Sequence, residues 1–130
     1  MIITRTPFRV TLGGGGTDLP SYYSKFGGFI FSFALDKYMF IYVNRPIVDD
    51  LLRIKYSKSE TVSSVEDVEH DIARACMQKT GITKAIEIAS MADIPAGSGL
   101  GSSSTYTVGL LNALHTMKRD YISLHDLAEE

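Results

Sequence analysis

Near its N-terminus the chain alternates between apolar and polar side chains, which is the period of a half-buried β-strand. We expect a strand over residues 2–12, and these side chains form its apolar face: Phe8, Val10 and Leu12. Its other face holds Arg5, Arg9 and Thr11. The strand ends at the glycine run 13–16, after which Thr17 and Asp18 are expected to cap a short helix that reaches Phe26.

Two segments that follow are dense in aromatic and β-branched residues, as strands are. They cover residues 29–35 and 38–43, and the pair 36–37 between them (Asp-Lys) predicts a two-residue hairpin turn. A further strand is expected over 51–56 and a polar loop over 57–64. The aromatic stripes are expected in the core, because no basic groove accompanies them as a base-stacking surface would need.

The second half of the chain changes to helical periodicity, with apolar side chains three to four positions apart. Helices are expected over residues 65–79, ended by Gly81, and over 102–117. A short strand is expected between them, at 84–89. A last helix is expected to begin near the end of the chain, because residues 123–126 resemble a capping box with aspartate in the acidic position.

Length, charge and cysteine content limit the class of protein. With 130 residues the chain fits one domain, and 13 basic against 15 acidic residues give a net charge of −2, which offers no polycation for nucleic acid. No apolar run is long enough to span a membrane, and the N-terminus lacks the apolar core of a signal peptide. The single cysteine, Cys76, has no partner for an internal disulfide. We therefore expect a cytoplasmic protein that binds neither nucleic acid nor membrane.

A stretch of glycines and serines before the long helix offers the clearest chemistry. Residues 95–104 have the sequence Pro-Ala-Gly-Ser-Gly-Leu-Gly-Ser-Ser-Ser. Glycine allows positive φ and lets a ligand approach the main chain closely, and a helix start presents free N–H groups and the positive end of the helix dipole. The serines can cap the helix or bond a metal or phosphate oxygen. This stretch therefore predicts an anion-binding loop of the kind that holds phosphate.

Two common glycine-rich nucleotide loops fit this stretch poorly. A Walker-type P-loop is excluded, because no Gly-Lys-Ser/Thr closes the loop. A dinucleotide-binding turn would use Gly97, Gly99 and, about twenty residues further on, Asp120. However, its third glycine is Ser102 here, and Asp120 follows a long predicted helix instead of a second strand.

The stretch instead resembles the P-x-x-x-G-L-G-S-S-[SA] motif of the GHMP kinases, the superfamily of galactokinase, homoserine kinase, mevalonate kinase and phosphomevalonate kinase. Residues 95–104 match every specified position of that motif. The N-terminal segment agrees independently, because Arg9 and Asp18 keep the spacing of the first motif of sugar kinases. The resemblance covers nearly the whole chain, from Arg5 to the helix after Ser104.

Within the superfamily, the glycine run points to one branch. Galactokinases have a Glu-His pair where this chain has Gly15 and Gly16. Residues 5–20 are similar to those of the D-glycero-D-manno-heptose 7-phosphate kinases, with the fucokinases nearby. Two glycines in place of two bulky polar side chains widen the sugar pocket, which suits a larger sugar phosphate.

The resemblance implies an α+β fold, the GHMP kinase N-terminal domain (ribosomal protein S5 domain 2-like), with a mixed β-sheet and helices on one face. Residues 1–130 would form this domain in truncated form, and the C-terminal domain of the family would be absent. The implied activity is an ATP-dependent sugar kinase that transfers the γ-phosphoryl group to the anomeric hydroxyl of D-glycero-D-manno-heptose 7-phosphate and gives the 1,7-bisphosphate, in nucleotide-activated heptose synthesis for surface polysaccharide. The family's metal-binding glutamate and acceptor-positioning aspartate would lie beyond residue 130, so this chain alone is not expected to complete catalysis.

The resemblance also implies roles for individual residues. It places ATP on Pro95, Gly97, Ser98, Gly99, Leu100, Gly101, Ser102, Ser103 and Ser104. Ser102 would also ligate Mg²⁺, which prefers oxygen ligands. Arg9 would polarise the acceptor hydroxyl or stabilise charge on the transferred phosphoryl group. The acceptor sugar phosphate would contact Arg5, Gly14, Gly15, Thr17 and Asp18.

Alternatives stay open within the resemblance. One is a kinase for another sugar, such as fucose. Another is a non-catalytic sugar or nucleotide sensor on the same fold, since the serine loop and Asp18 would serve binding alone. A direct ion pair between Arg9 and Asp18 would give both residues a purely structural role.

Overall fold

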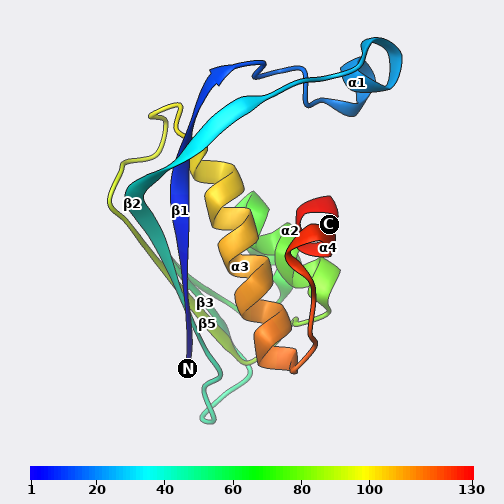
Figure 1. Cartoon of the computed structure of the whole chain (residues 1–130). Coiled ribbons are helices and arrows are strands. Elements are labelled where there is room, and N and C mark those ends of the chain that lie inside the picture. Colours follow the sequence, from blue (N-terminus) through cyan, green and yellow to red (C-terminus); the bar gives the residue numbers. More distant parts are fainter.

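The computed structural model describes all 130 residues and arranges five strands in one mixed sheet. The elements are β1 (Ile2–Gly13), α1 (Pro20–Phe26), β2 (Phe31–Asn44), β3 (Leu52–Lys55), β4 (Ser59–Val62), a 3₁₀ turn (Val65–Asp67), α2 (Asp71–Thr80), β5 (Ile86–Ala92), α3 (Ser102–Lys118) and α4 (Leu124–Glu129). The strand order is β1-β2-β5-β3-β4, in which β3 runs parallel to β5 and the other neighbours are antiparallel. Helices α2, α3 and α4 lie on one face of the sheet (Figure 1), so the expected α+β class is confirmed. None of the helices has both the length and the apolar character needed to cross a bilayer.

The core lies between the sheet and the helices, and α3 packs across β1 and β2. Their closest approach is at Gly109, where a Cβ would stand 2.9 Å from Thr6 Oγ1 and 3.2 Å from Ile41 Cγ1. Glycine therefore lets the helix come this near to the sheet. Thr4 Oγ1 also donates a hydrogen bond of 2.8 Å to the Gly109 carbonyl. These contacts fix the height of α3 above the sheet, and with it the position of the loop at its N-terminus.

The hairpin turn expected at residues 36–37 is wrong. One continuous strand, β2, spans both predicted segments and pairs with β1 on each side of this point. Pro7 lies opposite Tyr38, and the next pair is Arg9 opposite Ala34. Between these two pairs β1 takes a step of two residues and the antiparallel β2 takes a step of four. Residues 36–37 lie in this bulge of β2. Asp-Lys is not a favoured hairpin pair, and the long β1 offers both segments the same pairing partner.

Three other boundaries differ from the expectation. Residues 59–62, expected in a loop, form β4 at the sheet edge, where Thr61 lies opposite Arg53. The helix expected from residue 65 begins only with α2, because the carboxylate of Glu60 accepts the backbone N–H groups of residues 69–70 and holds the chain extended before the helix. The strand expected at 84–89 is β5, which starts and ends later because its pairing with β2 reaches Ala92.

The predicted helix ends are confirmed more often than the predicted strand ends. Helix α3 covers the expected segment and extends one residue further. Helix α2 stops at Gly81, which is left-handed with φ 72° and ψ 17°. Helix α4 starts after Ser123, whose Oγ accepts the backbone N–H of Asp126 as in a capping box.

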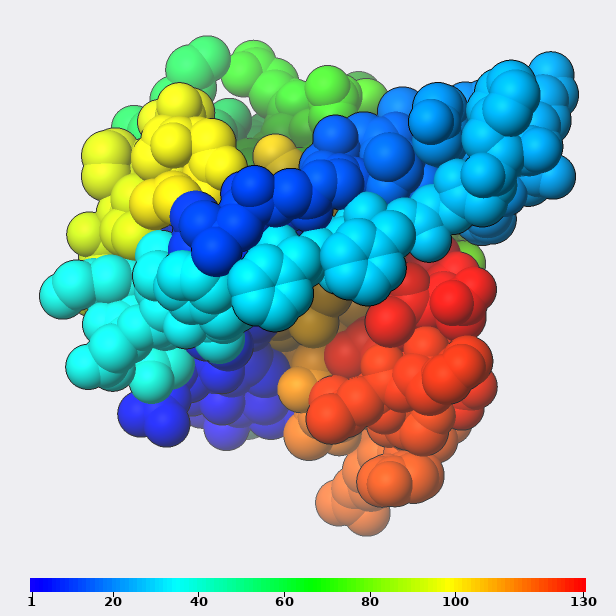
Figure 2. All heavy atoms as spheres, turned by 45° about the horizontal axis from the view of Figure 1, so that its top comes forward, coloured from blue at the N-terminus to red at the C-terminus, as the bar shows by residue number.

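Beyond the bulge, residues 10–34 form a two-stranded arm with α1 at its tip (Figure 1). Large apolar side chains of the arm are exposed: Leu12, Leu19, Tyr22, Tyr23, Phe26, Phe29, Ile30, Phe31 and Phe33. Figure 2 shows the arm, in blue and cyan, projecting past the rest of the molecule, with the red C-terminal segment beneath it. The caps expected for α1 are wrong, because Pro20 starts that helix after Leu19 without a side-chain cap.

Candidate functional site

The serine loop enters α3 through three glycines with positive φ. Gly97, Gly99 and Gly101 have φ of 81°, 75° and 78°, a region that other residues enter only with strain. Gly101 is the N-cap of α3, and the three serines fill the first helical turn. Of the two roles considered for the serines, capping this helix and bonding a metal or phosphate oxygen, the first is therefore absent. Because no side chain caps α3, the N–H groups of its first turn stay available to a ligand.

A small cavity of about 290 Å³, the glycine cradle, lies against this helix start. Its lining consists of Arg9, Ala96, Gly97, Gly99, Gly101, Ser102 and Ser103. The lining contains one charged side chain, the guanidinium of Arg9, and no carboxylate. Together with the positive end of the α3 dipole, this composition favours an anion.

Arg9 is held at the cradle from two sides. Its backbone N–H donates to the Leu100 carbonyl at 3.4 Å, which ties β1 to the serine loop. Its Nη1 donates to Thr11 Oγ1 at 2.7 Å, and its side chain lies against Gly101, where a Cβ would be 3.4 Å from Arg9 Cγ. The guanidinium is therefore positioned by a hydroxyl and leaves its charge unneutralised. No ion pair joins it to Asp18, so the structural pairing considered for these two residues is absent.

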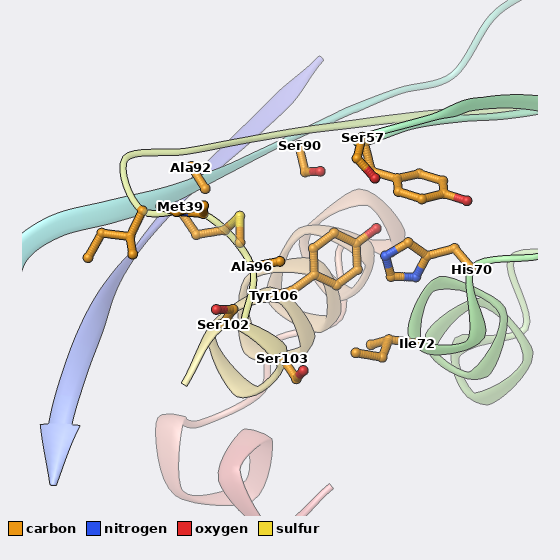
Figure 3. Close-up of a pocket in the computed structure, with 13 residues that line it drawn as sticks. Met39, Ser57, His70, Ile72, Ser90, Ala92, Ala96, Ser102, Ser103 and Tyr106 are labelled. Atoms are coloured by element: carbon orange, nitrogen blue, oxygen red, sulfur yellow. The ribbon is translucent and has the colours of Figure 1, made fainter. Parts of the chain in front are cut away.

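A second cavity of about 300 Å³, the aromatic pocket, opens next to the cradle and shares Ala96, Ser102 and Ser103 with it (Figure 3). Its lining consists of Met39, Tyr56, Ser57, His70, Ile72, Ser90, Ala92, Ile94, Pro95, Ala96, Ser102, Ser103 and Tyr106. A cavity of this size with mostly apolar walls and a few hydroxyls is typical of a small-molecule site.

Three rings form one wall of the aromatic pocket. His70 stacks on Tyr106 with ring centroids 4.7 Å apart, and Tyr56 meets His70 edge-on at 4.6 Å. His70 is also the N-cap of α2, since its Nδ1 accepts the Ala73 N–H at 3.3 Å. Burial raises the pKa of Tyr106 far above its usual value, so its hydroxyl stays protonated. Sequence analysis missed this wall, because its three rings come from separate segments of the chain and the helix was expected to start before His70.

A third cavity, the arm pocket of about 670 Å³, lies between the arm and α4. Its lining consists of Thr17, Asp18, Tyr23, Gly28, Phe29, Ile30, Ala128 and Glu129. Asp18 Oδ1 accepts the Gly16 N–H at 3.1 Å, and Thr17 Oγ1 donates to the Gly14 carbonyl at 2.7 Å. These bonds fold the glycine turn so that a carboxylate lines the cavity. Carboxylates and hydroxyls suit the hydroxyl groups of a sugar.

The remaining predicted site residues differ in whether they line one of the three cavities. Gly14 is structural, because a Cβ there would stand 1.7 Å from the Phe29 carbonyl oxygen, whereas a Cβ at Gly15 would stand 3.6 Å from Thr11 Cγ2, an ordinary contact. Leu100 packs against the core, and Pro95 lines the aromatic pocket. Ser98 and Ser104 are exposed and line none of the three cavities. Arg5 lies over the Tyr38 ring, 4.6 Å from its centroid, and also lines none of them.

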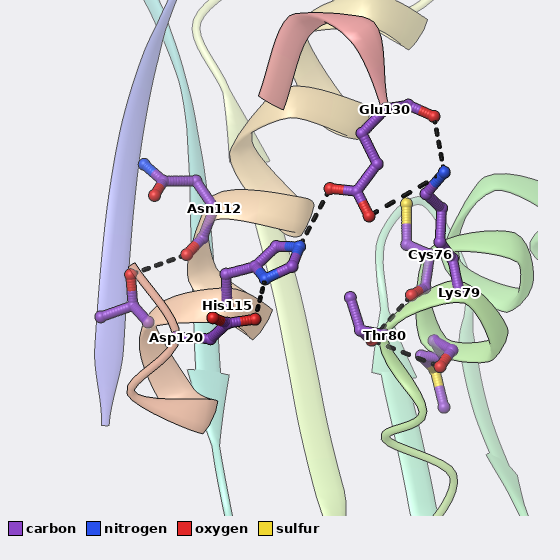
Figure 4. A network of polar contacts seen from close by, with 9 residues as sticks. Cys76, Lys79, Thr80, Asn112, His115, Asp120 and Glu130 are labelled. Atoms are coloured by element: carbon purple, nitrogen blue, oxygen red, sulfur yellow. Dashed lines mark hydrogen bonds and ion pairs between the residues drawn. The ribbon is translucent and has the colours of Figure 1, made fainter. Parts of the chain in front are cut away.

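A separate polar cluster fastens α4 at the far end of α3 (Figure 4). His115 is buried, and its ring nitrogens lie 3.2 Å from Asp120 Oδ2 and 2.9 Å from Glu130 Oε2. Lys79 Nζ of α2 donates to the Glu130 carbonyl at 3.0 Å. Burial, with the nearby Glu130 carboxylate, raises the pKa of Cys76 to about 11. No group of three His, Cys, Asp or Glu side chains in the chain could hold a metal ion.

Comparison with known proteins agrees with the motifs. A family profile described as GHMP kinases N terminal domain matches residues 49–130. A D-glycero-alpha-D-manno-heptose 7-phosphate kinase from Campylobacter jejuni subsp. jejuni serotype O:2 is 30% identical over 123 residues, which cover 86% of this chain and 36% of that protein. The chain thus spans about a third of the length of this curated relative.

Solved structures share the fold. A D-glycero-D-manno-heptose 1-phosphate kinase from Bacteroides thetaiotaomicron superposes with a TM-score of 0.84 at 23% identity, over 99% of this chain and 46% of that one. Methanococcus jannaschii mevalonate kinase superposes with a TM-score of 0.78 at 19% identity, over 98% of this chain and 44% of that one. The profile match covers more than half of the chain, and both structures repeat its architecture. The chain therefore belongs to the GHMP kinase family and has the fold of that family's N-terminal domain.

Proposed function

We propose that this chain is the N-terminal domain of an ATP-dependent sugar kinase whose acceptor is D-glycero-D-manno-heptose 7-phosphate. The observation that supports it best is that the glycine cradle adjoins the aromatic pocket, while Arg9 of the cradle bonds Thr11 at the base of the arm that carries the third cavity. The glycine cradle shares residues with the aromatic pocket on one side, and Arg9 lies between the cradle and the arm on the other. This order matches a nucleotide base, its phosphates, and an acceptor beyond the terminal phosphate.

The nucleotide would lie along the first two cavities. The cradle offers N–H groups of the α3 start, three flexible glycines and one guanidinium to the triphosphate. The aromatic pocket would take the nucleoside, because it is apolar and begins at Ser102 and Ser103, where the cradle ends. ATP is thus the expected phosphoryl donor.

Mg²⁺ would arrive with the nucleotide and neutralise its phosphate oxygens. Ser102 fits one position in the metal's shell, because its hydroxyl lines the cradle and does not cap α3. One hydroxyl, phosphate oxygens and water together suit an ion that prefers oxygen ligands and keeps several waters. Within these 130 residues no group of three His, Cys, Asp or Glu side chains could hold a metal ion.

The acceptor would lie on the arm side of Arg9. Asp18 and Thr17 would accept and donate hydrogen bonds to sugar hydroxyls, and Gly15 leaves room beside Thr11. In the transfer, a bond forms between the acceptor oxygen and the γ-phosphorus while the bond to the β-phosphate oxygen breaks. Arg9 would stabilise the charge that develops on the γ-phosphoryl oxygens. The acceptor proton would go to a base outside this chain, in the C-terminal domain that we propose for the whole kinase.

The substrate branch rests on the curated relative and on the glycines at positions 15 and 16. The Campylobacter jejuni protein is a D-glycero-alpha-D-manno-heptose 7-phosphate kinase by name. A Cβ built at Gly15 would stand 3.6 Å from Thr11 Cγ2, and one built at Gly16 would meet no protein atom within 4 Å. The space beside both glycines would therefore be open to a larger acceptor. The role of Arg5 at the acceptor phosphate remains a prediction, as does a cytoplasmic location.

The test compares acceptors in the complete kinase. We expect kcat/KM with Mg·ATP to be higher for the heptose 7-phosphate than for fucose, and higher for fucose than for galactose. A preference for galactose would refute the branch, and a preference for fucose would assign the neighbouring branch. Binding of both ligands without any transfer would favour the sensor.

A further inference from the structure

The hydroxyl of Tyr106 is the one buried side-chain polar atom without a hydrogen-bond partner. Tyr106 is 5% exposed, and it stands on the first turns of α3 at the back of the aromatic pocket. Figure 3 shows the hydroxyl pointing toward the side of the pocket where Ser57 and His70 lie. A buried hydroxyl that no protein atom bonds is costly, so it indicates a partner that comes from outside the protein.

Polar groups of Ser57 and His70 lie on the side of the pocket toward which this hydroxyl points. His70 stacks on the Tyr106 ring, and its Nδ1 is already engaged by the Ala73 N–H, which leaves Nε2 as a donor. Met39, Ile72 and Ile94 form apolar walls elsewhere in the pocket. A flat ring with apolar faces and a hydrogen-bonding edge fits this division, and a nucleobase has that shape.

The hydroxyl is within reach of such a ring after a small movement. His70 stacks on the Tyr106 ring, Tyr56 packs edge-on against His70, and both residues are only half-buried. A rotation of the Tyr56 side chain would open this corner of the pocket and keep the bond between His70 Nδ1 and the Ala73 N–H. The loss of the Tyr56 edge contact would be offset by the new hydrogen bond.

We propose that the Tyr106 hydroxyl is the protein's contact with the edge of the nucleobase, and that it sets the preference for ATP over ligands that lack a base. This inference rests on the proposed function, since it takes the glycine cradle as the phosphate site. It goes beyond that function in assigning base recognition to one atom. Tyr106 is therefore a specificity-determining residue, distinct from the groups that hold the phosphates.

The test is a cycle that removes the hydroxyl from the protein and the base from the ligand. Calorimetry would measure the dissociation constants of Mg·ATP and of Mg·tripolyphosphate for the wild-type chain and for Tyr106→Phe. We expect Tyr106→Phe to weaken Mg·ATP by about 5-fold, the typical effect of one neutral hydrogen bond, and to leave Mg·tripolyphosphate unchanged. Tyr121→Phe, which removes the hydroxyl of an exposed tyrosine that lines none of the three cavities, is the control and should leave both constants unchanged.

The outcomes separate the two levels of the proposal. If the wild-type chain binds neither ligand, the proposed function fails, and this inference fails with it. If the wild type binds both and Tyr106→Phe binds both equally well, only the role of Tyr106 is refuted. An equal loss for both ligands, or the same loss in Tyr121→Phe, would also refute it. The melting temperature of unliganded Tyr106→Phe should not fall, because no hydrogen bond is lost.

Discussion

The glycine cradle can be tested by comparing two glycines with the same backbone and different surroundings. Gly99 in the serine loop has φ 75°, and Gly81 at the end of α2 has φ 72°. A Cβ built on either one meets no protein atom within 4 Å. Alanine therefore meets a similarly positive φ at both sites and no steric clash with the protein. Only Gly99 lines the cradle, so the pair separates strain from ligand contact.

The expected loss of stability is similar for Gly99→Ala and Gly81→Ala. Placing a residue with a Cβ in the left-handed region costs about 1–2 kcal/mol, part of which is offset by the lower entropy of the unfolded chain. The net value is about 1 kcal/mol. For a domain of this length, an unfolding entropy of about 2.1 cal/mol/K per residue converts that into a fall in Tm of about 4 °C.

The expected loss of binding differs between the two variants. In Gly99→Ala the added methyl group stands where phosphate oxygens approach the main chain. Losing one charge-assisted hydrogen bond costs about 1.5–3 kcal/mol, which corresponds to a rise of about tenfold or more in the dissociation constant of Mg·ATP. Gly81→Ala should bind as the wild type does. Calorimetry with melting curves would check both values, and an unchanged affinity in Gly99→Ala would show that the loop does not hold the phosphates.

Two further predictions concern Arg9 with Asp18, and Cys76. In the complete kinase, Arg9→Met should mainly lower kcat, by ~100-fold or more, as for loss of one preorganised electrostatic donor, whereas Asp18→Asn should mainly raise the KM for the sugar. Steady-state kinetics together with a melting curve would check both effects. A normal kcat in Arg9→Met would remove Arg9 from the mechanism. Burial raises the pKa of the Cys76 thiol to about 11. Between the ordinary thiol pKa and this value, the unfolded chain releases the proton while the folded chain keeps it. The free energy of unfolding should therefore fall as pH rises from the ordinary thiol pKa toward 11. Denaturant titrations should show a smaller fall in Cys76→Ala, and an identical pH dependence in the two proteins would contradict the burial of the thiol.

Local patterns predicted the helices better than the sheet. Gly81 and Ser123 end and start their helices through bonds made within a few residues, so the sequence contains the whole cause. Strand β4 has no apolar alternation and exists because β3 lies beside it. The bulge at residues 36–37 looks like a turn locally, and only the register with β1 shows that the strand continues. These features depend on partners that are distant along the chain.

The same distinction applies to the site. The serine loop was predicted because its residues are contiguous and their backbone chemistry is local. Arg9 could be assigned by motif spacing, whereas its bond to Thr11 and its contact with Gly101 required the fold. The pocket wall of His70 and Tyr106 joins residues more than thirty positions apart, and each looks like an ordinary helix residue in sequence.

The bulge in β2 has a consequence for how such domains can diverge. Its surplus over β1 is two residues, from a step of four against a step of two. Since side chains alternate with a period of two, a pair of residues can be inserted or deleted there without exchanging the inner and outer faces of either strand. Such a change would alter the twist of the ribbon and re-aim the arm that bears Asp18, while the bond from the Arg9 N–H to the Leu100 carbonyl would keep Arg9 beside the cradle. Insertions and deletions in pairs at this point could therefore adapt the domain to acceptors of different size while leaving its nucleotide side intact.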